Sequence, residues 1–240
     1  SVITVNAKDE IAQAVGVKGN KIVFVGTNEE IDQLIDEKTQ VIDLKGRTLM
    51  PGINDSHYHP ILNGMIGTDL DSAMVDTGFA QAKDIPSVLA ILKAVTDTKA
   101  PGKWVSSMGF EATLLKEQRY PTLEELDAVA PNNPLQAITC NGHNAIYNSK
   151  ALEYLKVYTA EDAKKYPEGE VVVADGKLTG EVRGHTHFWL WGQVEYTEPQ
   201  QRKAAMKSQK QCLELGITRV GDMGECDAPS YHIMQKMCRD

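Results

Sequence analysis

The chain contains little cysteine, and its cysteines form no Cys-x-x-Cys pair. The four residues, at positions 140, 212, 226 and 238, are also too sparse for a disulfide scaffold. We therefore expect reduced thiols and a cytoplasmic protein.

Long hydrophobic runs and an excess of positive charge are also missing. No apolar stretch approaches the roughly 20 residues of a membrane span, and no signal-peptide pattern opens the chain. Lys and Arg number 25 against 33 Asp and Glu, which gives a net charge of −8 with the acids spread along the chain. These features argue against a nucleic-acid surface. We expect a small-molecule substrate, with no nucleic-acid and no membrane partner.

The hydrophobic content of 42% and charged content of 24% are ordinary for a globular protein. Residues 1–50 predict a β-rich portion with one helix. Gly19-Asn20 is typical of a tight hairpin turn between two strands. Thr27-Asn28-Glu29-Glu30 is a capping box, which predicts a short helix through about Asp36. A second strand pair is expected on either side of Lys45-Gly46.

From Gly52 onward, predicted strands alternate with predicted helices, as in a parallel α/β arrangement. Strands are expected at Ile53–His57, Trp104–Met108, Leu135–Cys140 and Thr218–Asp222, and helices at about 86–98, 122–130, 149–156 and 198–215. Ser149 is the expected N-cap of the third helix. Residues 158–196 interrupt this alternation of strands and helices. Their turn pairs Glu168-Gly169 and Asp175-Gly176 predict a hairpin-bearing insertion.

The most informative segment is Leu49-Met50-Pro51-Gly52-Ile53-Asn54-Asp55-Ser56-His57-Tyr58-His59-Pro60. On a strand, residues i and i+2 point to the same face, so His57 and His59 would project together. Imidazole suits metals such as Zn²⁺, which makes this strand end a candidate for half of a metal site. Two ordinary strand histidines are the alternative. Asp55 would share their face and either orient a ligand histidine or hydrogen-bond the backbone of the Pro-Gly turn.

The Pro-Gly-x-x-Asp-Ser-His-x-His context resembles the amidohydrolase superfamily, whose first barrel strand ends in a His-x-His pair of metal ligands. Four further segments follow in family order and are similar to its YtcJ-like branch, amidohydrolase family 3. They are Trp104 to Glu111, Leu126 to Pro134, Gly142 to Leu152 and Gly216 to Asp222.

This resemblance implies an α/β fold: part of a (β/α)₈ TIM barrel metal-dependent hydrolase with a small N-terminal β-sandwich portion. Residues 1–50 would belong to the sandwich, and residues 51–240 would form the first half of the barrel, with an insertion at about 158–196 over its mouth. A complete barrel takes ~250 residues. The remaining ligands and the general base are therefore expected outside this chain, in a missing C-terminal half or in the second subunit of a homodimer. The chain alone is expected to be inactive.

Three further residues are candidate substrate contacts. His143 follows the predicted strand Leu135–Cys140, where barrel strand ends face the active site, and the resemblance implies a substrate-binding or polarising role. Glu111 follows the second predicted strand, where a pocket residue and a surface-loop acid are the two interpretations. Asp222 ends the fourth strand and would point into the barrel mouth.

One position departs from the YtcJ-like pattern. The branch commonly reads Thr-Gly-x-x-x-acid after its insertion, whereas Thr179-Gly180 is followed at that position by Gly184. If the acid supports metals, its absence weakens the site. His185-Thr186-His187 forms a second His-x-His, which is a candidate source of nitrogen ligands instead.

The implied reaction is hydrolysis of a carbon–nitrogen (not peptide) bond in a small amide-like substrate. One or two divalent metal ions, with zinc expected, would lower the pKa of bound water and polarise the scissile carbonyl. His57 and His59 would hold the first metal. The rival hypothesis is a non-catalytic binding or regulatory protein that retains the amidohydrolase fold. The incomplete ligand set and Gly184 favour this rival.

Overall fold

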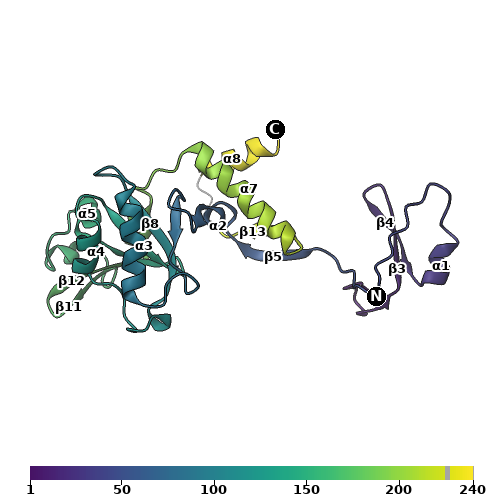
Figure 1. The fold of residues 1–240 in the computed structure, drawn as a ribbon, viewed down its shortest axis with the longest axis horizontal. Coiled ribbons are helices and arrows are strands. Elements are labelled where there is room, and N and C mark those ends of the chain that lie inside the picture. Colours follow the sequence, from purple (N-terminus) through teal and green to yellow (C-terminus); the bar gives the residue numbers. More distant parts are fainter. Residues whose placement is uncertain (225–227, 240) are drawn as a thin grey trace. The chain divides into compact units, whose positions relative to one another are not determined.

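Two units make up the computed structural model, which describes residues 1–224 and 228–239, without the side chains of 228–230. One unit combines Ser1–Tyr58 with Cys212–Gly221, and the other combines His59–Gln211 with Asp222–Asp240. Figure 1 labels the elements of both.

The first unit consists of short strand pairs with little buried surface, of which β1–β2 and β3–β4 are antiparallel. Its strands are β1 (Val2–Ile3) paired with β2 (Ile11–Ala12), β3 (Ala14–Lys18) paired with β4 (Lys21–Gly26), and β5 (Ile53–Tyr58) paired with β13 (Ile217–Asp222). The expected hairpin at Gly19-Asn20 and the Thr27 capping box are therefore confirmed, although helix α1 (Asn28–Asp32) is shorter than predicted.

The second strand pair predicted for this unit is wrong. Lys45-Gly46 forms a turn, but the segments beside it do not pair with each other, and Leu49 makes a single parallel bridge to Val2. A two-stranded pair is marginal without a covering layer. Val41 and Ile42, which are 65% and 69% exposed, have no such layer in this unit.

A seven-stranded sheet forms the framework of the second unit. Its strand order is β11 (Val171–Ala174), β12 (Lys177–Arg183), β10 (Asn144–Tyr147), β9 (Leu135–Thr139), β8 (Val105–Phe110), β7 (Met74–Asp76) and β6 (Ile66–Gly67). Strands β6 to β9 are parallel and the others are antiparallel. The parallel α/β arrangement and the hairpin in the 158–196 segment are thus confirmed. Closure into a barrel and the β-sandwich remain predictions.

Residues along these strands alternate between two cores, as strand geometry requires. Val75, Ala137 and Ile146 face helices α3 (Ile85–Asp97) and α4 (Leu123–Val129). Their neighbours Met74, Ile138 and Ala145 face the opposite core, which contains residues of α2 (Pro60–Met65), α6 (Gly184–Trp191) and α7 (Glu198–Glu214). Both faces of the sheet are therefore covered, and Figure 1 shows α3 and α4 against one of them.

The remaining helical elements include the helix predicted at 149–156, whose cap is reassigned, and others that the sequence analysis did not predict. They are α5 (Ser149–Leu152), α8 (Ala228–Met237) and the short 3₁₀ turns Ala112–Leu114, Glu153–Leu155 and Asp162–Lys165. Asn148, not Ser149, caps α5, because its side-chain oxygen accepts from the Ala151 amide at 3.0 Å. Ser149 instead donates to Asp127.

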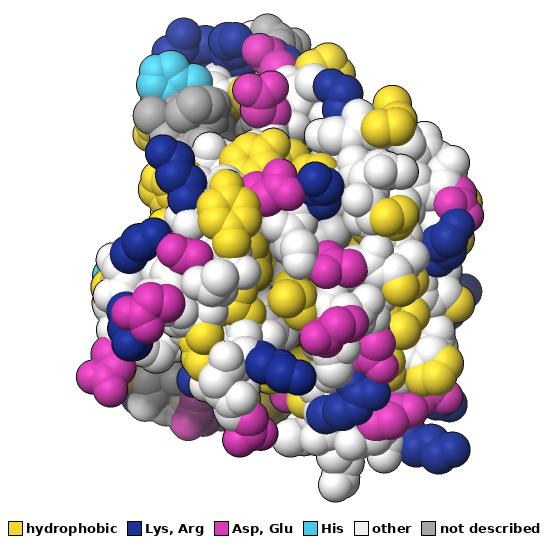
Figure 2. Space-filling model, turned by 90° about the vertical axis from the view of Figure 1, so that its left-hand side faces the viewer, with side chains coloured by type: hydrophobic (Ala, Val, Ile, Leu, Met, Phe, Trp, Pro, Cys, Tyr) yellow, Lys and Arg dark blue, Asp and Glu magenta, His cyan; other side chains and the backbone are white. Residues whose placement is uncertain are grey.

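None of the helices in the described ranges combines the length and apolar character needed to cross a bilayer. On the face drawn in Figure 2, acidic and basic side chains are interspersed around apolar ones.

Candidate functional site

A cavity of about 490 Å³ in the second unit brings two of the predicted site residues together. His59 and Asp222 both line it, although they are far apart in the sequence. Most of its other lining is apolar and comes from α2, from α6 and from the segment after α6, including Ile61, Met65, Phe188, Trp191 and Tyr196. This size and lining are typical of a small-molecule site, in which a few polar groups fix the orientation of the ligand.

His57 and His59 differ in local structure, because β5 ends at Tyr58 and only His57 belongs to the strand. His57 is an exposed residue of β5, in the first unit. His59 is the half-buried N-cap residue of α2, in the second unit, because Pro60 at the first helical position starts a helix there. Asp55 accepts from the backbone amide of His57 at 3.0 Å, so its contact here is with the backbone. The metal-binding role of the two histidines stays a prediction.

Asp222 ends β13, as the sequence predicted, and offers an unused acceptor to the cavity. Its Oδ1 accepts from the Gly224 amide at 3.2 Å. Its Oδ2 is buried and has no hydrogen-bond partner within the described part of the chain. A buried carboxylate oxygen without a donor is costly, so a cation or a substrate donor there would be stabilising.

His143 lies beside this cavity and does not line it. It occupies the turn after β9, with its imidazole exposed and edge-on to the Phe188 ring at 5.8 Å between centroids. Its backbone amide donates to Asn141 Oδ1 at 2.7 Å. Because Phe188 lines the cavity, His143 stands one side chain away from it.

Glu111 belongs to a different group of side chains. It follows β8, as predicted, and its Oε2 lies 3.7 Å from the Cys140 thiol. Burial and the nearby Glu111 charge raise the pKa of Cys140. Glu111 does not line the cavity with His59. Its substrate role remains a prediction.

Three aromatic side chains of the cavity were not singled out as a set by sequence reasoning. The rings of Phe188 and Trp191 are nearly parallel, at 16° and 6.5 Å, and the Trp191 indole donates to Tyr196 at 3.4 Å. Burial raises the pKa of Tyr196. Their signal is the i, i+3 spacing of Phe188 and Trp191, which matters only once the segment is recognised as a helix.

Across the residues that the structure describes, no three His, Cys, Asp or Glu side chains are grouped as a metal site. Further ligands are needed for a catalytic zinc, which normally takes three protein ligands.

A sequence model described as the amidohydrolase family matches residues 40–239. The chain belongs to the amidohydrolase family. Over 233 residues it is 33% identical to the N-substituted formamide deformylase of Arthrobacter pascens, a match covering 92% of this chain and 41% of that protein. It is 25% identical over 182 residues to the putative amidohydrolase YtcJ of Bacillus subtilis, covering 75% and 32% of the two chains.

Among solved structures, the chain resembles an uncharacterized metal-dependent hydrolase from Pyrococcus horikoshii. The TM-score is 0.58 at 22% identity, over 93% of this chain and 41% of that one. This likeness shows a shared fold. The chain thus spans between 32% and 41% of the length of these three relatives.

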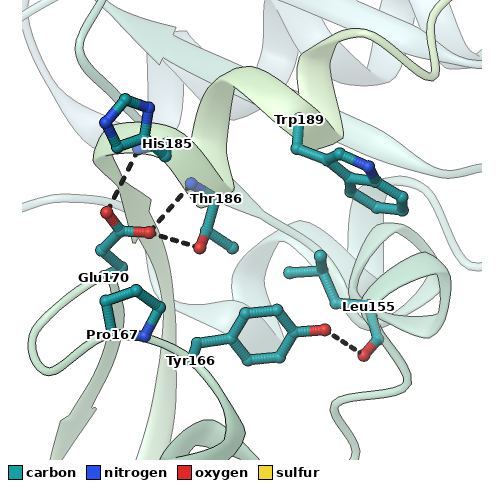
Figure 3. A pocket seen from close by; sticks show the side chains of 7 residues that line it. All are labelled: Leu155, Tyr166, Pro167, Glu170, His185, Thr186 and Trp189. Atoms are coloured by element: carbon teal, nitrogen blue, oxygen red, sulfur yellow. Dashed lines mark hydrogen bonds between the residues drawn. The ribbon is translucent and has the colours of Figure 1, made fainter.

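Gly184, where the YtcJ-like pattern has an acid, is required by its surroundings. Its φ is +57°, a conformation that favours glycine, and a Cβ there would lie 2.7 Å from Glu170 Oε1. Glu170 accepts from the amides of His185 and Thr186, at 3.2 and 2.9 Å, and from the Thr186 hydroxyl (Figure 3). These bonds, led by the Thr186 hydroxyl, lower the pKa of Glu170. A carboxylate from another segment therefore occupies the start of α6.

The second His-x-His does not supply a pair of ligands, so that hypothesis is wrong. His185 and His187 lie on helix α6, where residues i and i+2 point about 200° apart. His187 is fully buried and both of its ring nitrogens are used: Nδ1 lies 2.8 Å from the Tyr147 hydroxyl and Nε2 lies 3.2 Å from the Gly142 carbonyl oxygen.

Sequence reasoning also passed over Glu181, which is the acid nearest in sequence to position 184. Glu181 is 7% exposed and forms a two-pronged ion pair with Arg183, at 2.7 and 2.9 Å. Asn144 donates to the same carboxylate at 2.9 Å. The bond to Glu181 raises the pKa of Arg183. The charge of Glu181 is therefore compensated locally.

Proposed function

We propose that the natural protein containing this chain is a metal-dependent hydrolase of a carbon–nitrogen bond, other than a peptide bond, in a small amide-like substrate. Membership of the amidohydrolase family supports this reaction class, and the relative from Arthrobacter pascens is named as a deformylase of N-substituted formamides. The observation that carries the proposal is the meeting of His59 and Asp222 at one apolar cavity.

The donor atoms at this cavity fit a divalent metal. Imidazole nitrogen and carboxylate oxygen are both zinc ligands, and Asp222 Oδ2 is a buried acceptor with no hydrogen-bond partner among the described residues. One or two divalent metal ions would bind here, with zinc as the expected metal. His57 and His59 would hold one of these ions, and Asp222 would be the nearby carboxylate. A bound metal would supply an acidified water and a polarised carbonyl.

The chain's own residues would bind and orient the substrate. The apolar walls from α2 and α6 would hold its uncharged substituent and exclude water, with Phe188 and Trp191 as the flat surface. His143, packed on Phe188, would donate an imidazole N–H to the substrate carbonyl oxygen. Glu111, set apart from the cavity, would serve only a substrate that extends beyond it. The general base is expected outside this chain.

One observation favours the rival, a non-catalytic binding or regulatory protein with the amidohydrolase fold. Within the described residues the ligand set stops short of three side chains. Such a protein would bind a small amide in the apolar cavity without turning it over.

Metal content separates the two functions. We expect the purified full natural protein to carry about one tightly bound divalent ion or more per chain, measured by elemental analysis. His57→Ala and His59→Ala should each lose most of it, whereas His185→Ala, which changes an exposed histidine of α6, should retain it. A metal content near zero in the wild type, or one equal in all four proteins, would reject the metal site.

A further inference from the structure

His187 is a fully buried titratable residue that the proposed reaction does not use. Its side chain is 0% exposed in the core between the sheet and α6. It contacts one strand residue, Tyr147, and one turn residue, Gly142, through opposite sides of its ring.

The partners of this ring determine which of its nitrogens donates a hydrogen bond and which accepts one. The Gly142 carbonyl oxygen can only accept, so Nε2 of His187 carries the hydrogen and donates. Burial lowers the pKa of His187 to about 4, so the ring is neutral near pH 7. Nδ1 is therefore the acceptor, and the Tyr147 hydroxyl donates to it at 2.8 Å.

The strand side of this chain of bonds is buried and hydrogen-bonded across the sheet. Tyr147 is completely buried in β10, and its hydroxyl also lies 3.5 Å from Gln136 Oε1 on the neighbouring strand β9. The Gln136 amide in turn donates to Ser106 of β8 at 3.0 Å. Three adjacent strands thus hold the donor that fixes the tautomer of His187.

The turn side of the chain carries His143. Gly142, held by His187, immediately precedes it and has a φ of +72°, which favours glycine. The Gly184 amide at the start of α6 donates to the His143 carbonyl at 3.2 Å, and Phe188 packs against the His143 ring. Residues 184, 187 and 188 of one helix therefore contact two consecutive residues of the turn.

We infer that His187 is a positioning residue: as a neutral Nε2–H tautomer it fixes the 140–143 turn, and thereby holds the His143 imidazole against Phe188 at the edge of the His59 cavity. This inference rests on the proposed function for the role of His143 in the reaction. The hydrogen bond to Gly142 distinguishes it from a histidine that only fills the core, because it joins the ring to the backbone of the turn that carries His143.

Four variants of the full natural protein test this inference. His187→Leu removes both hydrogen bonds at similar volume, and His187→Gln retains an N–H that can reach the Gly142 carbonyl. Tyr147→Phe removes only the donor to Nδ1, and His185→Leu is the control on the exposed side of the same helix. For each, amide hydrogen exchange at Gly142 and His143 is measured by NMR, together with kcat and KM for hydrolysis of an N-acyl amine.

We expect His187→Leu to speed exchange at Gly142 and His143 at least 10-fold over His185→Leu. It should lower kcat/KM on the order of 100-fold, with His187→Gln recovering most of the loss. The exchange rates and kcat/KM of Tyr147→Phe should lie between those of His187→Leu and those of His187→Gln. If His187→Leu does not fold, the exchange rates of His187→Gln and Tyr147→Phe are compared with those of the His185→Leu control to test the inference.

Unchanged exchange at the turn in a folded His187→Leu or Tyr147→Phe protein overturns the inference, as does a His187→Gln protein no better than His187→Leu. Absence of any amide hydrolysis by the wild type would instead reject the proposed function. The exchange measurement still decides the role of His187 in that case.

Discussion

At the scale of single residues, Gly184 is explained by the carboxylate of Glu170 that lies where its side chain would begin. The position has a positive φ of +57° and a contact of 2.7 Å from a built Cβ to Glu170 Oε1. An acid at 184 would disturb the cap of α6, so its absence reflects a different local packing. It is weak evidence for a lost metal site.

We predict that Gly184→Ala destabilises the protein more than Gly176→Ala. Both positions have positive φ, which costs an alanine roughly 1–2 kcal/mol, but a Cβ at Gly176 has nothing within 4 Å. The contact with Glu170 should add about 1–2 kcal/mol at position 184. Urea unfolding of both variants measures the difference, and equal losses would show that Glu170 moves aside without cost.

His187 predicts a pH dependence of stability. Its pKa is about 4 in the folded protein, through burial, against 6.5 unperturbed, so the unfolded chain binds a proton that the folded chain does not between these values. The stability is therefore fully present above pH 6.5 and is lost as the pH falls toward 4. The loss should reach about 3 kcal/mol, because one pKa unit corresponds to roughly 1.4 kcal/mol.

Other groups titrate in the same range, so the measurement compares wild type with His187→Gln by urea unfolding at pH 7.5, 6, 5 and 4. The wild type should lose more stability over this range than the variant. Parallel pH profiles would mean that His187 is not held neutral.

Residue identities allowed part of the site to be predicted. Reasoning from strand ends predicted that Asp222 ends a strand, which the structure confirms, whereas His59 follows β5 as the N-cap residue of α2. It failed for His185 and His187, because the His-x-His sequence alone does not show whether the pair lies on a strand or on a helix. It also missed Glu181, whose importance comes from Arg183 and Asn144 around it.

At the scale of elements, Asn148 joins several parts of the second unit. Its Oδ1 accepts from the amides of Leu135 and Ala151, and its Nδ2 donates to the carbonyls of Ala130 and Asn133. The side chain is 0% exposed, so each of these groups would lack water if the side chain were removed.

We predict that Asn148→Ala costs on the order of 3–5 kcal/mol of folding free energy, since it leaves several buried polar groups without partners. Thr122→Ala, which removes the exposed cap of α4, should cost only about 1 kcal/mol. Thermal or urea unfolding provides the comparison. Similar losses in both variants would contradict the role of Asn148 as a junction.

Helix α6 presents two tryptophans to two different places. Trp191 lines the cavity with His59, whereas Trp189 is 53% exposed and lines a smaller cavity of about 310 Å³ near Glu170 (Figure 3). The same helix therefore offers a matched pair of variants.

Trp191→Ala should weaken binding of an amide with an apolar substituent about 10-fold, roughly 1.4 kcal/mol, while Trp189→Ala should change it less than about 2-fold. Calorimetric titration with substrate or a non-hydrolysed analogue measures both. A larger effect of Trp189→Ala on binding would indicate that the substrate binds in the smaller cavity.

Most helices were predictable because their ends carry strong local signals. The capping boxes at Thr27, Thr122 and Thr197 all form. Strand pairing was less predictable. Strand β10 has only four residues, all of them buried, so it shows no alternation of apolar and polar residues from which a strand could be predicted. Its antiparallel pairing to β9 and β12 depends on tertiary contacts.

At the scale of the whole molecule, the two units differ in how much apolar surface they bury. The second unit has two cores on the faces of its sheet, whereas residues such as Ile22 and Ile42 of the first unit are 68% and 69% exposed. Local sequence signals specify the β3–β4 hairpin of the first unit. They do not specify what covers it, because that depends on residues distant in the chain or in another chain.

Metal-dependent hydrolysis of an amide-like carbon–nitrogen bond is the function that we propose for the full natural protein. The most direct measurement is amine release from a panel of N-acyl and N-formyl amines by the full natural protein, before and after chelation and after addition of Zn²⁺. We predict activity that disappears on metal removal and returns with zinc in the wild type, but not in His59→Ala. Turnover that persists undiminished in the metal-free protein, or its absence from a wild type loaded with metal, would rule out this function.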